Sequence, residues 1–275
     1  MEKKPFVTKS QVEEIVKTYP TPFHLYDEKG MRENMKALKE AFSWNKGYRE
    51  YFAVKAEPNP FIIKKLKEEG TEGANVLGAH LEGPFISPKA IGAQNPNFLL
   101  APSVENYNKI VGDYSDAVVS ITMAPEVEGA KELIKYLSDN GVTVSMGHTK
   151  ATYDEAIEGI KCGACHSTHL YNAMTPFTHR EPGVVGATFD TDITTETISD
   201  GIHISYPALR TAYKQKGTDK VLLVSDAMEA CGMPDGQYSL GGQDVIVKNG
   251  AARLLDGTLA GSVLTLDKAV KNIYN

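Results

Sequence analysis

The stretch Cys165-His166-Ser167-Thr168-His169-Leu170-Tyr171-Asn172-Ala173-Met174 decides the expected fold. The residues before His169 are mostly small or β-branched, as at the end of a buried strand, and His169 and Asn172 stand in the loop that follows. Three other apolar segments also end in a residue type that binds metals or transfers protons: residues 76–81 lead to Glu82, 142–146 to His148 and 221–225 to Asp226. Because the strand ends of a parallel β/α barrel converge on one face, we expect these four side chains to meet there.

From residue 73 onward, predicted strands alternate with predicted helices. Strands are expected at 76–81, 117–122, 142–146, 164–168, 195–198 and 221–225, and helices at 125–139, 153–161, 207–215 and 266–274. Such alternation indicates a parallel sheet covered by helices. The N-terminal part adds predicted helices at 11–17, 27–42 and 60–70 and two more strands, at 22–26 and 50–55. Eight strands are the number that a closed barrel needs, so the predicted fold class is α/β, a TIM-type (β/α)8 barrel.

The composition excludes several classes of protein. The chain has 275 residues, a hydrophobic fraction of 41% and a charged fraction of 23%, as in an ordinary globular domain. Its net charge of -6 argues against a nucleic-acid-binding protein, and no apolar run approaches the roughly 20 residues of a membrane span. Three cysteines are too few for a disulfide scaffold, so the expected location is the cytoplasm.

Glu82, His148 and His169 form a candidate metal site. Zinc and similar divalent ions accept histidine nitrogen and carboxylate oxygen, and a catalytic ion keeps three protein ligands and an open position for water. Zn²⁺ suits this set best, and Fe²⁺ or Co²⁺ would also fit. Either histidine alone would be read as an ordinary core or loop residue. We expect His80 and His166 to be structural, because strand alternation should turn them away from the ligands.

Asp226, in Val-Ser-Asp-Ala-Met, is the candidate general acid and base. A carboxylate beside a metal site can take a proton from water and return it to a leaving amine. The alternative is that Asp226 caps the N-terminus of a helix. Arg180 and His203 are candidate anion or sugar contacts, since the planar guanidinium of arginine suits phosphate.

Residues from about 73 to 275 resemble the N-acetylglucosamine-6-phosphate deacetylases of the amidohydrolase superfamily. The resemblance rests on short motifs in a fixed order: Gly78-Ala79-His80-Leu81-Glu82-Gly83-Pro84-Phe85, Gln94-Asn95-Pro96, Met123-Ala124-Pro125-Glu126, Gly147-His148-Thr149, residues 168–174, Arg180-Glu181-Pro182-Gly183, Ser199-Asp200-Gly201-Ile202-His203, Ser225-Asp226-Ala227 and Gly261-Ser262. The resemblance implies that Glu82, His148 and His169 bind the metal and that Asp226 is catalytic. It also implies that Asn172, Ala173, Arg180 and His203 hold the sugar phosphate, the last two from a neighbouring subunit in some assemblies.

The sequence departs from the family pattern at both ends. Members of the family have an accessory β-sandwich domain and a His-x-His pair in the first barrel strand, and neither is found before residue 73, where His24 stands alone. The expected domain at 73–275 is therefore a deacetylase barrel truncated at its C-terminus. The missing pair makes a second metal ion doubtful.

Residues 1–72 resemble a different family, the diaminopimelate-type decarboxylases, which use pyridoxal phosphate. The similar motifs are Thr21-Pro22-Phe23-His24-Leu25-Tyr26-Asp27 and Tyr51-Phe52-Ala53-Val54-Lys55-Ala56, in which Lys55 matches the Schiff-base lysine. The glycine-rich phosphate loops of that family are absent, so Lys55 has nothing to position the cofactor. The expected domain at 1–72 supplies the first units of a composite barrel.

The function that follows is metal-dependent hydrolysis of N-acetylglucosamine 6-phosphate to glucosamine 6-phosphate and acetate. The alternatives are an inactive composite barrel or sugar-phosphate-binding module, and a fragment of a pyridoxal-phosphate decarboxylase. The expected partner is a small amino-sugar phosphate, without nucleic acid or membrane, and the family resemblance implies a homodimer.

Overall fold

The structure, a computed structural model, describes residues 5–46, 61–62 and 77–274, which divide into two compact units. The first unit comprises residues 1–52 and 59–76, and the second comprises 53–58 and 77–275. In the first unit, α1 (Lys9–Ile15) begins with a capping box between Thr8 and Gln11. Helix α2 (Glu28–Ala41) begins one residue after the predicted start, because Asp27 is its N-cap: the Asp27 carboxylate accepts a hydrogen bond from the Gly30 N–H over 2.9 Å.

The prediction of a strand at residues 22–26 is wrong. This segment forms no strand in the described structure, and Leu25 and Tyr26 are exposed. Its apolar side chains therefore have no sheet face to bury, and the preceding proline lacks the N–H that a strand ladder needs. The strand predicted at 50–55, which includes Lys55, lies outside the described residues.

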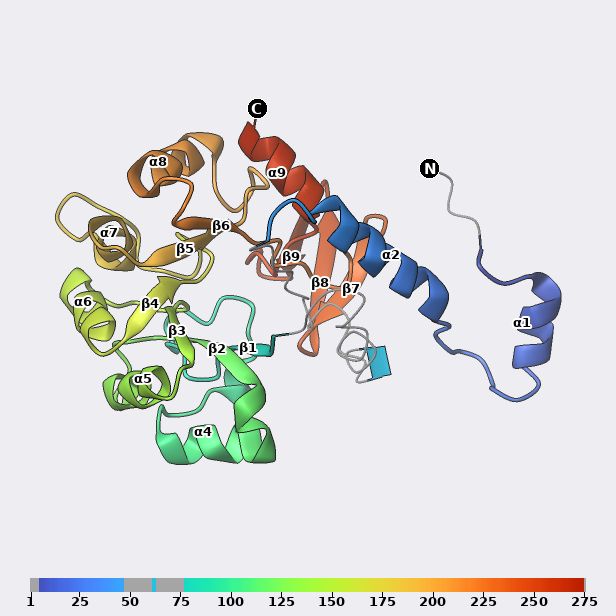
Figure 1. Ribbon diagram of the computed structural model, residues 1–275, viewed down its shortest axis with the longest axis horizontal. Coiled ribbons are helices and arrows are strands. Elements are labelled where there is room, and N and C mark those ends of the chain that lie inside the picture. Colours follow the sequence, from blue (N-terminus) through green and yellow to red (C-terminus); the bar gives the residue numbers. More distant parts are fainter. Residues whose placement is uncertain (1–4, 47–60, 63–76, 275) are drawn as a thin grey trace. The chain divides into compact units, whose positions relative to one another are not determined.

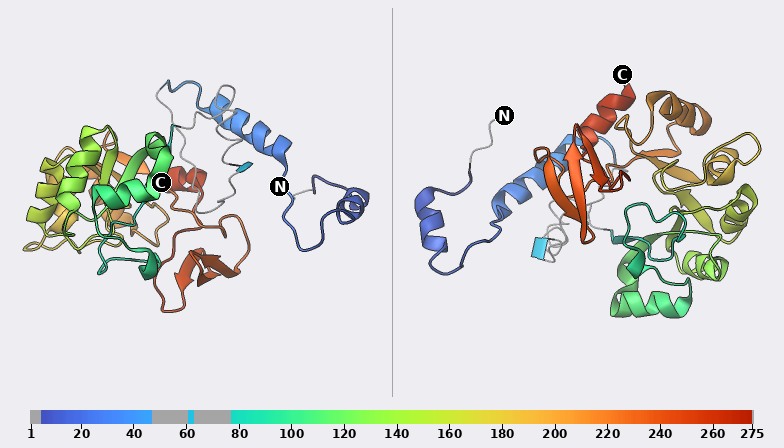
Figure 2. Two further views of the ribbon diagram at one scale, coloured as in Figure 1. Left: turned by 90° about the horizontal axis from the view of Figure 1, so that it is seen from below. Right: turned by 180° about the vertical axis from the view of Figure 1, so that it is seen from behind.

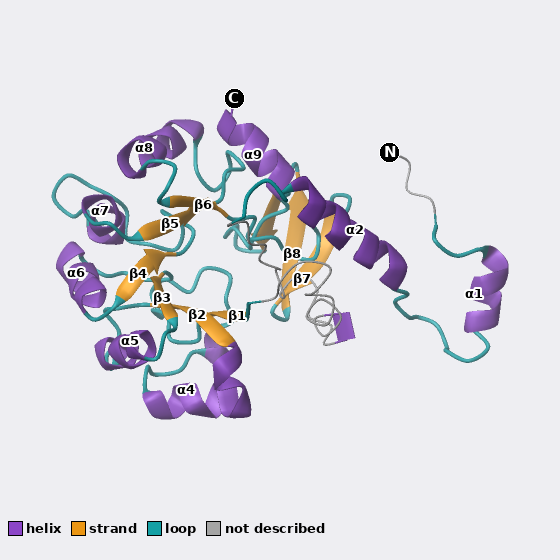
Figure 3. Cartoon of the chain, in the orientation of Figure 1, coloured by secondary structure: helices purple, strands orange, loops and turns teal. Residues whose placement is uncertain are grey.

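The second unit is built on a parallel sheet whose described strands follow one another in chain order. They are β1 (Ala79–Glu82), β2 (Val118–Met123), β3 (Thr143–Met146), β4 (Ala164–Ser167), β5 (Thr194–Thr197) and β6 (Val221–Leu223). All six were predicted. The sheet curls as a half-barrel, with loops leaving the strand ends (Figures 1 and 3). A complete eight-stranded barrel is not confirmed, because the described residues supply six parallel strands.

Helices lie along the outer side of this curled sheet (Figure 1). They are α4 (Val104–Val111), α5 (Ala130–Asp139), α6 (Tyr153–Lys161), α7 (Gly183–Asp190) and α8 (Tyr206–Lys216), with α9 (Leu266–Tyr274) near the end of the chain. Short 3₁₀ segments span Pro96–Phe98 and Gly112–Ala117. Helix α5 begins five residues after the predicted start because Gly129, at φ 82°, serves as its N-cap. Helices α4 and α7 were not predicted.

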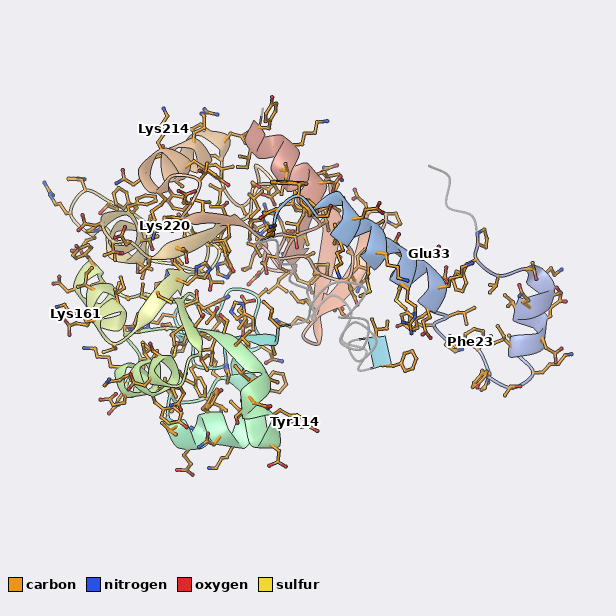
Figure 4. The ribbon with its side chains drawn as sticks, in the orientation of Figure 1. Phe23, Glu33, Tyr114, Lys161, Lys214 and Lys220 are labelled. Atoms are coloured by element: carbon orange, nitrogen blue, oxygen red, sulfur yellow. The ribbon has the colours of Figure 1, made fainter. Side chains whose placement is uncertain are left out.

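Helix faces divide clearly between core and solvent. Leu133, Ile134 and Leu137 of α5 are fully buried and belong to the main core. In Figure 4, Lys161 of α6 and Lys214 of α8 point away from the sheet. This amphipathic pattern fixes the helices on the outer face, so the carboxyl ends of the strands remain available for a site.

A second, antiparallel sheet was not predicted. It consists of β7 (Gly236–Leu240), β8 (Gln243–Lys248) and β9 (Ala251–Leu254), joined by two short turns (Figure 2). Val245 and Val247 of β8 are buried together with Met228 in a small core of their own. None of the helices that the structure describes has both the length and the apolar character needed to cross a membrane.

Replacing Leu133 by alanine should test whether α5 anchors the half-barrel. Leu133 is fully buried, so the change removes apolar contacts and leaves a cavity that costs about 2–5 kcal/mol of unfolding free energy. Chemical denaturation of the native and variant chains measures this loss. Lys131→Ala, on the exposed face of the same helix, should change the unfolding free energy by less than about 0.5 kcal/mol. Equal effects of the two substitutions would contradict the packing described here.

Candidate metal centre

Three predicted ligands meet at the carboxyl edge of the parallel sheet. Glu82 is the last residue of β1, and His148 and His169 each lie two residues beyond the ends of β3 and β4. The Nε2 atom of His148 is 2.9 Å from Oε1 of Glu82, and Nε2 of His169 is 3.3 Å from the same oxygen. The two Nε2 atoms are 3.1 Å apart. Within the described part of the chain, no other group of three such side chains converges this closely.

The donor set fits a divalent cation. The Nδ1 atom of His148 is 2.9 Å from the carbonyl oxygen of Ala90, which can only accept, so Nδ1 carries a proton. In the neutral ring, Nε2 therefore presents a lone pair toward Glu82 and His169. Ligands on a tetrahedral zinc ion, with bonds of about 2.0–2.2 Å, lie roughly 3.3–3.5 Å from one another. The observed separations are close to these values.

The ligand turns have an unusual backbone. His148 (φ 48°), His169 (φ 32°) and Asp226 (φ 50°) all adopt left-handed conformations, as do Tyr171 and Ala173 in the turn after His169. A non-glycine residue in this region costs of order 1–3 kcal/mol, and such residues concentrate at functional sites. Asn249 is the one other non-glycine residue at positive φ in the described structure. The strain therefore coincides with the predicted site.

Backbone hydrogen bonds tie the ligand turns to one another. The N–H of Ser87 donates to the carbonyl oxygen of His148 over 2.9 Å, and the N–H of Thr149 donates to that of Ala173 over 3.0 Å. Gly147 lets the chain pass closely, because a Cβ atom there would lie 2.7 Å from a methyl group of Thr122. The ligands thus belong to one connected network.

Two carboxylates that the sequence analysis gave no role hold the histidine turns. Glu126 accepts hydrogen bonds from the Thr149 hydroxyl and the Lys150 N–H, both over 2.6 Å. Glu196, on β5, is 3.4 Å from the His169 N–H and forms an ion pair of 3.3 Å with His166. Burial, the largest single effect, would raise the pKa of Glu196, but the hydrogen bond with His166 and the nearby histidines His166, His80 and His169 together lower that pKa. One signal was available: among the six strands predicted from residue 73 onward, Glu196 is the single charged residue, and buried charges are usually paired.

A row of side chains with hydrogen-bonding groups runs across the sheet beneath the ligands. Nε2 of His80 is 2.8 Å from the hydroxyl of Thr122, which is 2.7 Å from that of Thr168. The hydroxyl of Ser145 is 2.6 Å from the same Thr168 oxygen. His80 is thus hydrogen-bonded within the sheet. However, strand alternation does not turn His80 away from Glu82, as was predicted, because the two residues are two positions apart and share a face of the strand.

Asp226 lies three residues beyond the end of β6, in the loop at the carboxyl edge of the sheet. Its negative charge, together with the hydrogen bond and charge of Glu82, contributes to the raised pKa of His169. Its carbonyl oxygen accepts a hydrogen bond from the Ser262 N–H over 2.8 Å. No helix begins at Asp226, so the alternative role as an N-cap is wrong.

Burial alone would lower the pKa of His169. The hydrogen bond with Glu82 and the nearby negative charges of Glu82, Asp226 and Glu196 outweigh this and raise the pKa to about 9. In the absence of metal, His169 is therefore an imidazolium at neutral pH. A metal ion that binds there must replace its proton.

The predicted substrate contacts have different surroundings. Asn172 donates from its side-chain amide to the carbonyl oxygens of Leu170 and His169, over 3.1 and 3.3 Å, and so stabilises the ligand turn. His203 is buried, and its Nδ1 lies 2.6 Å from the carboxylate of Asp200. Burial tends to raise the pKa of Asp200, but the hydrogen bond with His203 lowers it overall.

Arg180 lies in an exposed loop before α7. In the described structure it makes no contact with the three ligands. Its substrate-binding role stays a prediction, as do those of Asn172, Ala173 and His203. Lys55, the cofactor lysine of the decarboxylase alternative, lies outside the described residues.

Metal affinity should rise with pH. Below a pKa of about 9, His169 holds a proton that Zn²⁺ must displace, so the dissociation constant should fall about tenfold per pH unit between pH 7 and 8.5. Competition with a chromophoric chelator measures the affinity. Calorimetry in two buffers of different ionisation enthalpy should show about one proton released per ion bound. An affinity independent of pH over this range would contradict the assignment.

The chain has relatives among known proteins, although no protein-family model matches it. The N-acetylglucosamine-6-phosphate deacetylase of Bacillus subtilis (strain 168) is 44% identical over 211 residues, which make up 76% of this chain and 53% of that protein. The chain thus spans about half the length of the curated relatives it matches.

Solved structures of N-acetylglucosamine-6-phosphate deacetylases are also similar to the chain. An aspartate-to-alanine variant of the deacetylase from Mycobacterium smegmatis, in complex with N-acetyl-D-glucosamine-6-phosphate, is 35% identical with a TM-score of 0.71, covering 76% of this chain and 55% of that one. The enzyme from Thermotoga maritima is 31% identical with a TM-score of 0.67, covering 96% of this chain and 66% of that one. Nothing in these comparisons supports the decarboxylase-like segment predicted for residues 1–72. Over about three-quarters of its length, the chain is homologous to proteins named N-acetylglucosamine-6-phosphate deacetylase.

Proposed function

We propose that the chain hydrolyses the N-acetyl group of N-acetylglucosamine 6-phosphate, giving glucosamine 6-phosphate and acetate. The observation that carries the proposal is the convergence of Glu82, His148 and His169 at one sheet edge, in a chain whose homologues bear the name of this activity. Two imidazole nitrogens and a carboxylate oxygen are the donor set of many catalytic zinc sites.

The proposed cofactor is a divalent metal ion on these three residues. Zn²⁺ suits the nitrogen and oxygen donors best, and Fe²⁺ or Co²⁺ is also compatible. When bound, the ion would polarise the amide carbonyl and lower the pKa of a water molecule. The protein orients the ligands: the Ala90 carbonyl fixes the ring of His148, and the left-handed turns aim both histidines toward Glu82.

Asp226 is the proposed general base and then general acid. Two observations support this role: Asp226 follows β6, on the same edge of the sheet as Glu82, His148 and His169, and its charge contributes to the raised pKa of His169. It would accept a proton from the attacking water and deliver it to the nitrogen of the departing glucosamine. Asp226 takes up one proton and gives up one proton, so the side chain is unchanged after a turnover.

The substrate would be held by groups around this edge. Asn172 and Ala173 belong to the turn that carries His169, and this position supports a role for them as contacts of the sugar. Arg180 and His203 are the proposed phosphate contacts, and the Asp200 carboxylate orients the ring of His203. We further propose a cytoplasmic enzyme acting on a small molecule, as a homodimer, in which Arg180 and His203 contribute to a neighbouring subunit's site.

Asp226→Asn should abolish most of the activity without removing the metal. General acid–base catalysis contributes about 10²–10⁴-fold to a rate, so kcat should fall by a factor in this range while zinc content stays equal to native. Release of glucosamine 6-phosphate, followed by amine derivatisation, provides the assay. Asp219→Asn, an exposed position just before β6, serves as the matched control and should keep native activity.

The same assay also distinguishes the proposed enzyme from the alternative function, a sugar-phosphate-binding module. A native chain that binds zinc and N-acetylglucosamine 6-phosphate but releases no amine would be the sugar-phosphate-binding module. Native turnover by a fully metallated Asp226→Asn protein would overturn the role assigned to Asp226.

Arg180→Ala should weaken recognition of the phosphate selectively. Loss of a charge-assisted hydrogen bond costs about 1.5–3 kcal/mol, so KM for the phosphorylated sugar should rise about ten- to hundredfold. Steady-state kinetics with N-acetylglucosamine, which lacks the phosphate, should show little change. Arg210→Ala, at an exposed position on α8, is the control. Equal losses with both sugars would contradict the phosphate role.

A further inference from the structure

The two histidine ligands are fixed in different ways. The ring of His148 has a hydrogen bond of its own, from Nδ1 to the carbonyl oxygen of Ala90. The Nδ1 atom of His169 is buried and has no hydrogen-bond partner among the described residues. Metal-binding histidines almost always use their second nitrogen for such a bond, which sets the orientation of the ring. The placement of His169 must therefore come from its backbone.

That backbone is held from β5, at Glu196. The Glu196 carboxylate accepts from the N–H of His169 over 3.4 Å, and its carbonyl oxygen accepts from the N–H of Leu170 over 2.9 Å. One residue of a rigid strand thus contacts two successive amides of a turn whose first residue is strained at φ 32°. A strained conformation persists only where its surroundings over-determine it.

Glu196 is itself held firmly. Its other carboxylate oxygen pairs with Nε2 of His166 over 3.3 Å, and Nδ1 of His166 lies 2.6 Å from the hydroxyl of Thr194. The side chain of Glu196 is 15% exposed and that of His166 is 9% exposed, so this pair lies in the sheet rather than at the surface. A buried charge with a hydrogen-bonded partner has little freedom to move.

We propose that Glu196 is a positioning residue for the metal centre: paired with His166, it holds the His169 turn in its left-handed conformation and so aims Nε2 at Glu82 and His148. The inference rests on the proposed metal site. Glu126 acts on the other turn, but there the ring of His148 keeps its own bond to Ala90, so the dependence should be weaker.

The test compares metal binding by the native chain with binding by Glu196→Gln, at one fixed pH. Loss of such a supporting contact typically costs 10–100-fold in metal affinity, so the zinc dissociation constant of Glu196→Gln should rise at least about tenfold. Glu126→Gln should raise it by less. Thr195→Val is the control: it removes a buried hydroxyl from the same strand, bonded to Ser167 over 2.6 Å, and should lower the melting temperature without changing zinc affinity.

A spectroscopic measurement distinguishes positioning from general stability. With Co²⁺ as the probe, the visible absorption of Glu196→Gln should differ from native in intensity and position, because the coordination geometry around the ion has changed. The spectrum of Thr195→Val should match the native one. If Glu196→Gln does not fold, Glu196→Asp, which keeps the charge but withdraws it by one methylene, replaces it with the same expectations.

The outcomes are separable. Native zinc affinity and a native Co²⁺ spectrum in Glu196→Gln would overturn the inference and leave the metal site intact, as would a Glu126→Gln effect as large as that of Glu196→Gln. A native chain that binds no zinc would overturn the metal site and the inference together. Zinc binding without deacetylation, with the affinity of Glu196→Gln reduced, would overturn the proposed activity alone and support the positioning role.

Discussion

The site depends on bringing three electron-rich atoms within about 3 Å of one another. Two imidazole nitrogens and a carboxylate oxygen repel one another through their lone pairs unless a proton or a metal ion lies between them. Here the proton is on His169, whose pKa is raised to about 9. The fold must supply the force that keeps the donors together, and it does so through turns at the carboxyl edge of a parallel sheet.

Rigidity at that edge comes from contacts between turns that are distant in sequence. Ser87 bonds to the turn of His148, Thr149 bonds to Ala173, and Asp226 is fixed through Ser262. Each left-handed ligand residue is energetically unfavourable alone, so the network of hydrogen bonds and the buried strands behind it must offset the strain. The helices on the outer face contribute by packing apolar side chains such as Leu133 and Ile134 into the main core. The site and the core are therefore stabilised by the same elements.

The sequence predicted the parts of the molecule that local patterns specify. The six strands coincide with short, mostly apolar segments, and Glu82, His148 and His169 stand at or just beyond the ends of three of them. Helix α7 was not predicted because it contains residues of low helix propensity, namely Gly183, Gly186 and its valines. The helix forms because most of its residues are buried in the folded protein. The sheet of β7 to β9 was missed because its alternation is short and interrupted by glycines. Glu196 could be noticed as a charge in a strand, but its contact with the turn after β4 is a property of the folded sheet.

The row of hydroxyls beneath the ligands has a consequence for the direction of its hydrogen bonds. Each hydroxyl has one proton, so Thr122, Thr168 and Ser145 cannot orient independently. If Nε2 of His80 carries hydrogen, the row donates away from His80 toward Ser145; if Nε2 is bare, every bond in the row reverses. Hydrogen bonds in such chains polarise one another. The tautomer of the His80 imidazole therefore selects between two opposite directions of the dipole along this row of hydroxyls. An electric field beneath the candidate metal site is thus set by an imidazole that is not one of the three proposed ligands.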